Sequence, residues 1–170
     1  MENRFSHFQS FFLVLTPACH FHYSVIRTMP TRRDTLSFLV NMGGYVYEVT
    51  ITQSFSAAHS LKEIGGTCEK LHGHNFIVEV SLCSPALNNA GIVIDFKIVK
   101  EWIDEILRTF DHKYLNELSN FHGQNPSAEN IARYIHDRAS EKAKIHHVGV
   151  ACVSVWESEN TRASYRGNTQ

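Results

Sequence analysis

The chain has 170 residues, of which 43% are hydrophobic and 19% are charged, and its formal net charge at pH 7 is −1. These values are typical of a single globular domain and exclude a disordered chain. The charge is nearly balanced and basic residues do not cluster among aromatic ones, so no nucleic-acid partner is expected.

Residues 1–43 do not resemble the rest of the chain. A short apolar block, Phe11 to Leu15, is followed by prolines, histidines and arginines without a sustained period. The block is too short for a membrane span or a signal-peptide core. We therefore predict no membrane segment, and an N-terminal extension that is poorly ordered or outside the true start, with Met29 or Met42 as later starts. The domain itself is predicted over residues 44–170.

Two strands are predicted at the start of this domain. Tyr45 to Ser56 and Phe76 to Cys83 are rich in β-branched and aromatic residues, and a loop from Leu61 to Lys70 separates them. A helix follows. Asp95 is suited to be its N-cap, and apolar residues recur at helical spacing from Val99 to Phe110.

The second half of the domain is predicted as a helix and two further strands. Asn125-Pro126-Ser127 indicates a helix start with proline at or near the first helical position. Val148 to Val155 and Thr161 to Arg166 are β-rich runs. The order strand, strand, helix, helix, strand, strand favours an α+β fold in which two helices cover one face of an antiparallel sheet.

Three histidines could meet on the first two strands. His72 and His74 are two positions apart, so a strand would place both imidazoles on one face, and His59 ends the preceding strand-like run. Three nitrogen ligands with one open position are typical of a catalytic zinc ion. Cys68 lies in the glycine-containing loop before His72, where a nearby cation would ease ionisation of the thiol. It is therefore either a fourth ligand or a base.

The four cysteines do not form a disulfide framework, because Cys19, Cys68, Cys83 and Cys152 are widely and irregularly spaced. This pattern favours a reducing compartment, and we predict a cytoplasmic protein.

Several segments between Tyr45 and Gly167 occur in the order of a known family. They are Phe55 to His59, Cys68 to His74, Gly91 to Phe96, Phe110 to His112 with Leu115-Asn116, Asn125 to Asn130, Glu157, and Tyr165 to Gly167. On these segments the chain resembles the 6-pyruvoyltetrahydropterin synthase superfamily, and most of all its 6-carboxytetrahydropterin synthase branch. The three-residue spacer between Cys68 and His72 resembles that branch, since animal-type pyruvoyl enzymes carry a longer one.

The resemblance implies a T-fold, in which an antiparallel four-stranded sheet carries two helices and the subunits join their sheets into a barrel. A homo-oligomer is expected, as a hexamer made of two trimers. The implied reaction, in queuosine biosynthesis, converts 7,8-dihydroneopterin triphosphate to 6-carboxy-5,6,7,8-tetrahydropterin and releases acetaldehyde and triphosphate. The alternatives are a pyruvoyl-forming synthase and a non-catalytic protein that binds zinc and pterin.

The resemblance also implies roles for individual residues. His59, His72 and His74 would bind zinc, and Cys68 would be the general base. Asp111 and His112 would be its acid/base partners, with His112 exchanging the proton and Asp111 setting the tautomer. Their ordinary interpretation is a turn-forming aspartate and a histidine at a helix C-terminus.

Glu157 is the expected anchor of the pterin ring, because a carboxylate can accept two parallel N–H bonds from the 2-amino-4-oxo edge. Ser127 and Glu129 match a segment that lines the pterin pocket, although a helix N-cap and a first-turn carboxylate also explain them. Lys62, Lys70 and Arg166 are candidates for the triphosphate. The other histidines are expected at the surface or without a role: His122, His136, His146, His147, His20 and His22.

Overall fold

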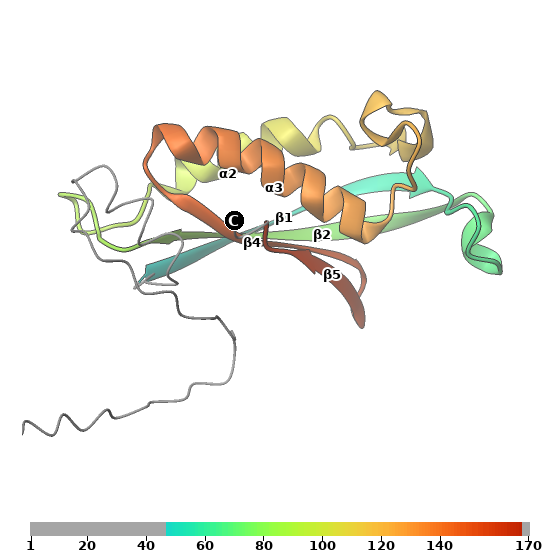
Figure 1. Ribbon diagram of the computed structural model, residues 1–170, viewed down its shortest axis with the longest axis horizontal. Helices are drawn as coiled ribbons and strands as arrows, with labels where there is room; N and C mark the ends of the chain where they lie inside the picture. The colour runs from blue at the N-terminus through green and yellow to red at the C-terminus, as the bar shows by residue number, and fades with distance from the viewer. Residues whose placement is uncertain (1–46, 168–170) are drawn as a thin grey trace, which may run out of the picture.

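The computed structural model describes residues 47–167, shown in colour in Figure 1. The predicted extension over residues 1–43, its alternative starts, and His20 and His22 lie outside the described residues.

A long antiparallel pair forms the centre of the sheet. Strand β1 (Tyr47–His59) pairs with β2 (His72–Ser84) in one continuous register that ends with His59 opposite His72. Both predicted strands are confirmed, and each extends further toward the intervening loop than their β-rich composition indicated. The extension matters because it places three histidines on paired backbone rather than in a loop.

Two further antiparallel strands complete one side of the sheet. Strand β4 (Gly149–Ser158) pairs with β2, and β5 (Thr161–Tyr165) pairs with β4. On the other side, the two-residue strand β3 (Lys113–Tyr114) runs parallel to β1, which gives the order β3-β1-β2-β4-β5. The prediction of four antiparallel strands omitted β3, because two residues are too few to show a period.

Both helices, α2 (Phe96–Leu107) and α3 (Ala128–Ile145), lie on the same face of the sheet, as predicted (Figure 1). The Asp95 side chain caps α2 by accepting a hydrogen bond from the Lys97 N–H at 2.8 Å, which confirms the predicted N-cap. The cap of α3 is Ser127, one of the two interpretations given for it from sequence, and Pro126 lies near the predicted helix start, two residues before the first helical position. A serine hydroxyl can accept a helix N–H, which makes Ser127 the better cap.

The core between sheet and helices leads to the histidines. Phe55 stacks on Phe76 at a ring-centroid distance of 4.8 Å and contacts Phe110 at 5.6 Å. The fully buried ring of His59 lies 5.5 Å from Phe76, at the end of this aromatic stack. The core therefore fixes one wall of the histidine site.

His136 is not at the surface, contrary to prediction. It is 9% exposed, with its ring 5.0 Å from that of Tyr165. A side chain added at Gly167 would come within 2.8 Å of the imidazole. His136 thus packs between α3 and the C-terminal end of β5. Its charged neighbours in the helix sequence give no sign of this burial.

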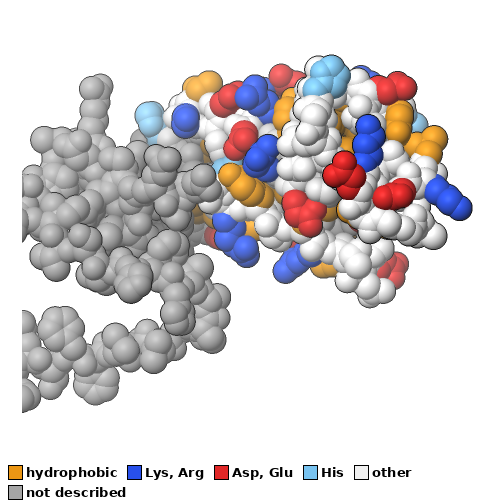
Figure 2. Space-filling view, turned by 45° about the vertical axis from the view of Figure 1, so that its right-hand side comes forward, with side chains coloured by type: hydrophobic (Ala, Val, Ile, Leu, Met, Phe, Trp, Pro, Cys, Tyr) orange, Lys and Arg blue, Asp and Glu red, His pale blue; other side chains and the backbone are white. Residues whose placement is uncertain are grey.

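Acidic and basic side chains are interspersed on the face shown in Figure 2, without a field of one sign. This mixture agrees with the nearly neutral composition. Within residues 47–167, no helix is both long and apolar enough to cross a membrane.

Candidate metal centre and active site

Three imidazoles converge where β1 and β2 meet the loop that joins them. His59 faces His72 directly across the ladder, and His74 lies opposite Ala57 on the same side. Ring centroids are 4.6 Å apart for His59 and His72, 5.2 Å for His59 and His74, and 4.9 Å for His72 and His74. One ring nitrogen from each lies within 4.8 Å of the others. A single ion could contact all three.

The hydrogen bonds of two rings leave the correct nitrogens for a metal. Nδ1 of His59 lies 2.8 Å from the Pro126 carbonyl oxygen, and Nδ1 of His72 lies 2.7 Å from that of Lys70. A carbonyl oxygen only accepts, so both Nδ1 atoms carry the proton and both Nε2 atoms present a lone pair. The buried Nε2 of His59 has no hydrogen-bond partner within the described residues. Such an orphaned acceptor fits a metal site of the catalytic zinc type.

Burial also keeps His59 in its ligand form. Desolvation is the main cause that lowers the pKa of His59 below 6.5, outweighing the Pro126 hydrogen bond and the attraction of Glu157. A neutral imidazole binds a metal and an imidazolium does not.

Glu157 points to the same space from a third strand. Its Oε1 lies 3.9 Å from Nε2 of His59, and the side chain is 27% exposed. The pairing of β4 with β5 shifts register between Trp156 and Ser158, so Glu157 lies at a bulge. Bulges re-aim side chains, and this one presents a carboxylate beside the His59 imidazole.

Asp111 and His112 form a second polar unit after the end of α2. Oδ2 of Asp111 lies 2.9 Å from Nδ1 of His112, and its Oδ1 accepts the Ser56 N–H at 2.9 Å. The bond from Ser56, followed by that of the His112 side chain, lowers the pKa of Asp111 below 3.8. The anion therefore holds the His112 proton on Nδ1 and leaves Nε2 available. His112 itself has φ = 55°, a left-handed backbone that histidine adopts more readily than bulkier residues.

An open hollow of about 540 Å³ connects this unit with the histidine cluster, since both His74 and His112 line it. The remaining lining is small or polar, including Ala58, Gly73 and Asn75. A small molecule bound there could contact His74 and His112 together.

Cys68 lies in the loop between His59 and His72, on the 3-10 turn η1 (Thr67–Glu69). Its thiol is exposed, and it does not belong to the three-histidine group. Within residues 47–167 the thiol makes no hydrogen bond, either to His112 or to the cluster. The structure therefore brings together His59, His72 and His74, with Glu157 beside His59. Cys68 is close to them in sequence but does not belong to the cluster.

Ser127 and Glu129 occupy the positions that helix capping explains. The Ser127 hydroxyl accepts the Asn130 N–H at 3.4 Å, and Glu129 is exposed in the first turn of α3. Both lie close in sequence to Pro126, which bonds to His59.

Sequence reasoning missed three residues around this site. Asn125 and Pro126 are predicted only as a helix start and Asn116 only as part of a family segment. In the structure Pro126 bonds to His59 at the end of β1, and the two asparagines bond to the residues that follow it. An asparagine outside a helix can indicate that its side chain supports a nearby strand end, because the amide can bond to backbone N–H and C=O groups.

The chain is similar to known proteins over most of the described residues. Residues 48–168 match the family described as 6-pyruvoyl tetrahydropterin synthase. A putative 6-carboxy-5,6,7,8-tetrahydropterin synthase of Archaeoglobus fulgidus is 38% identical over 118 residues, covering 69% of this chain and 94% of that protein. A dihydroneopterin monophosphate aldolase of Pyrococcus furiosus is 35% identical over 104 residues, covering 61% and 83%.

Solved structures share the fold. The 6-pyruvoyl tetrahydropterin synthase of Caenorhabditis elegans aligns with a TM-score of 0.64 at 25% identity, covering 73% of this chain and 99% of that one.

Proposed function

The chain belongs to the 6-pyruvoyl tetrahydropterin synthase family, and we propose that it is a zinc-dependent 6-carboxytetrahydropterin synthase. The proposed reaction converts 7,8-dihydroneopterin triphosphate and one water molecule to 6-carboxy-5,6,7,8-tetrahydropterin with release of acetaldehyde and triphosphate, as a step in queuosine biosynthesis. The observation that carries the proposal is the three-imidazole cluster, with the open Nε2 of His59, beside Glu157.

His59, His72 and His74 would hold the zinc ion. When bound, zinc supplies a Lewis acid that acidifies a hydroxyl group and polarises the neighbouring carbon centre of the substrate side chain. The residues prepare for this by directing Nδ1 of His59 and His72 to backbone carbonyl groups, so that neither ring needs to change tautomer.

Cys68, Asp111 and His112 would move the protons. The proposed base is the Cys68 thiolate, which accepts a proton from the substrate side chain. His112 exchanges a proton through its open Nε2, because its Nδ1 is bonded to Asp111. Cleavage of a side-chain carbon–carbon bond in a retro-aldol step then requires no redox cofactor.

Glu157 would hold the ring. Its carboxylate can accept two N–H bonds from the pterin, and its position 3.9 Å from Nε2 of His59 would place the ring next to the metal-bound side chain. Ser127 and Glu129 are proposed to line the same pocket, at the start of α3.

The carboxy product is favoured over a pyruvoyl product by the three-residue spacer between Cys68 and His72 and by the 38% identity to the Archaeoglobus protein. A pyruvoyl-forming enzyme would use the same residues and keep all three side-chain carbons. The name of the Caenorhabditis relative supports that second candidate.

We further propose a cytoplasmic homo-oligomer, a hexamer of two trimers. Free thiols at Cys68 and Cys152 suit a reducing compartment. Strand β5 leaves one edge of the sheet without a neighbour among the described strands, and edge pairing between subunits would cover it.

The test is to incubate zinc-loaded protein with 7,8-dihydroneopterin triphosphate and to measure acetaldehyde, triphosphate and the pterin product. Acetaldehyde in step with the carboxy product is the expected result. Triphosphate and a pyruvoyl product without acetaldehyde would establish the second candidate. The monophosphate should be assayed in parallel, given the Pyrococcus relative, and no turnover with retained zinc and pterin binding would indicate a binding protein.

A further inference from the structure

Two asparagine side chains hold the chain where it leaves β1. The Asn116 amide accepts the Ser60 N–H at 2.9 Å and donates to the Ser60 carbonyl oxygen at 2.8 Å. The Asn125 amide does the same for Lys62, at 2.8 Å and 2.9 Å. Each amide therefore satisfies both backbone groups of one residue, as a neighbouring strand would do.

These amides continue the sheet after its backbone pairing stops. The parallel ladder of β1 with β3 ends at Ala58 and Tyr114, and the chain then turns into η2 (Leu115–Glu117). The Asn116 side chain then bonds to the backbone of Ser60, two residues beyond the last ladder pair, as a strand would do. Ser60 is 9% exposed, so its backbone groups need partners.

The clamped segment in turn holds the loop of Cys68. Leu61 lies between the two clamped residues, and its N–H donates to the Cys68 carbonyl oxygen at 2.9 Å. At the other end of the loop, the Lys70 carbonyl oxygen accepts from Nδ1 of His72 at 2.7 Å. The position of Cys68 therefore depends on two hydrogen bonds, one from the Leu61 backbone two residues after His59 and one from the His72 ring.

One short segment supports the metal ligand and the loop together. The Asn125 side chain bonds to Lys62, while the carbonyl oxygen of the next residue, Pro126, bonds to His59. Asn130, in the first turn of α3, fixes this segment by donating to the Asn125 carbonyl oxygen at 2.8 Å. A shift of Asn125 would move the loop relative to His59.

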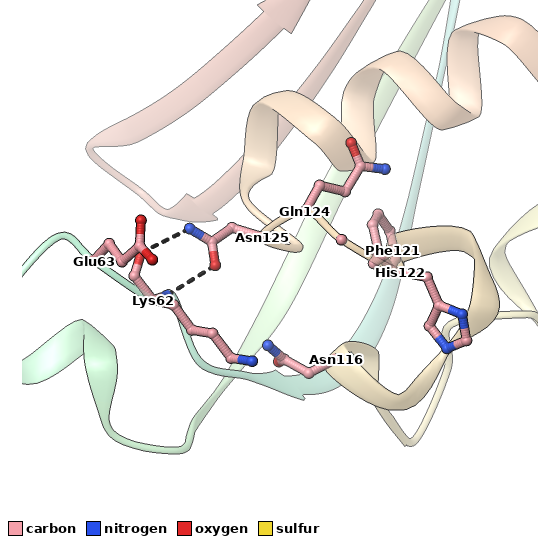
Figure 3. Close-up of a pocket in the computed structure, with 8 residues that line it drawn as sticks. Lys62, Glu63, Asn116, Phe121, His122, Gln124 and Asn125 are labelled. Atoms are coloured by element: carbon pink, nitrogen blue, oxygen red, sulfur yellow. Dashed lines mark hydrogen bonds between the residues drawn. The ribbon is translucent and has the colours of Figure 1, made fainter.

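A hollow of about 450 Å³ lies between the two clamps, lined among others by Lys62, Asn116, Gln124 and Asn125. Figure 3 shows the Asn125 amide directed at the Lys62 backbone and the Lys62 side chain running toward Asn116. Asn125 adjoins Pro126, which contacts the Nδ1 edge of His59, whereas a metal would take the Nε2 edge. The two asparagine amides therefore lie on the Nδ1 side of His59, away from the Nε2 atom that would bind the metal.

We propose that Asn116 and Asn125 are positioning residues that hold the Cys68 loop in a fixed place relative to the metal histidines. The catalytic part of this inference rests on the proposed function, in which Cys68 accepts a proton. A loosened loop misplaces the thiol, so kcat falls while KM and metal content stay the same.

The test compares Asn116→Ala, Asn125→Ala and Asn125→Asp with the wild-type protein by hydrogen exchange and by kinetics. Amide exchange in the peptide spanning Leu61 to Glu69 should be about tenfold faster or more in both alanine variants, with core strand peptides unchanged. Asn125→Asp keeps the acceptor for the Lys62 N–H and loses the donor, so an intermediate rate is expected. Turnover should fall about tenfold to a hundredfold in kcat, with KM within about twofold.

Gln124→Ala is the matched control. Gln124 lines the same hollow but bonds to the Asn120 carbonyl oxygen and to Arg133, so loop exchange and turnover should remain at wild-type values. Asn116→Ala could unfold, because it leaves the backbone groups of buried Ser60 without their partners. Asn125→Ala exposes only the backbone groups of Lys62, which is at the surface, so this variant should fold and still tests the clamp.

Unchanged loop exchange in Asn125→Ala would overturn the clamp. Faster exchange with unchanged kcat would overturn the positioning role. If the wild-type protein has no turnover, the proposed function fails, and hydrogen exchange still decides whether the asparagines hold the loop.

Discussion

Glu157 Oε1 lies 3.9 Å from Nε2 of His59, so the carboxylate faces the open edge of this imidazole. The two groups come from β4 and β1, which are separated in the sheet by β2. The bulge at Glu157 brings the carboxylate to the imidazole. Two roles are open to Glu157, ring anchor or additional metal ligand. A substitution would weaken pterin binding in the first case and metal binding in the second.

Glu157→Gln should weaken pterin binding and leave metal binding intact. The amide presents one acceptor oxygen where two are needed, and loss of a charged hydrogen bond costs about 1.5–3 kcal/mol, or about 10- to 100-fold in affinity. Binding of 7,8-dihydroneopterin by calorimetry, beside metal content by elemental analysis, measures both. Loss of the metal with unchanged pterin affinity would instead assign Glu157 to the metal.

His72→Ala should abolish stoichiometric zinc binding. The variant keeps two imidazoles, and a catalytic zinc site needs three protein ligands. Elemental analysis should show about one zinc per wild-type chain and much less in the variant. His122→Ala is the control, because His122 is exposed and outside the cluster; equal zinc in both variants would contradict the site.

Cys68→Ala should retain zinc and pterin and lose turnover by about 100-fold or more, since general-base catalysis contributes about 10²–10⁴. The side chain is exposed, so removal of the thiol costs little packing. Cys152→Ala is the control, since Cys152 lies on β4 outside the histidine cluster and its Sγ hydrogen-bonds to Ser154 Oγ at 3.8 Å. If Cys68→Ala loses zinc as His72→Ala does, the thiol is a ligand and not the base.

The strands, the helices and the convergence of His59, His72 and His74 could be predicted because each depends on a local pattern. The alternation at His72 and His74 requires only that the segment is a strand, and the Asp95 cap requires only its own helix. The matching family segments added the rest of the fold, except for β3, whose two residues pair through the sheet and show no pattern of their own.

The burial of His136 and the side-chain bonds of Asn116 and Asn125 could not be predicted from local sequence patterns. His136 is buried because Tyr165 and Gly167, 29 and 31 residues later in the sequence, pack on its ring. Asn116 and Asn125 act on residues 56 and 63 positions away. Such relationships depend on tertiary contacts, which neither propensity nor spacing encodes.

Asp111→Asn should lower kcat by about 100-fold or more while metal and pterin binding remain. The carboxylate holds the proton on Nδ1 of His112, and an amide can present N–H to that nitrogen and favour the wrong tautomer; a comparable change in a catalytic triad costs about 10⁴. Steady-state kinetics measure the effect. A rise in KM at unchanged kcat would place Asp111 in substrate binding instead.

Asp111 should also contribute to acid stability in a defined direction. The bonds from Ser56 and His112 hold its folded pKa below 3.8, so the unfolded chain binds the proton more readily. The stabilisation is therefore fully present above the unfolded pKa and is lost as pH falls through the folded pKa. Thermal unfolding of wild-type protein and Asp111→Asn should differ in Tm at pH 5, and the difference should shrink below pH of about 3.8. Glu159→Gln, at the exposed turn between β4 and β5, should show no such pH-dependent difference. A Tm difference that grows on acidification would mean that the carboxylate is strained rather than stabilised by its two partners.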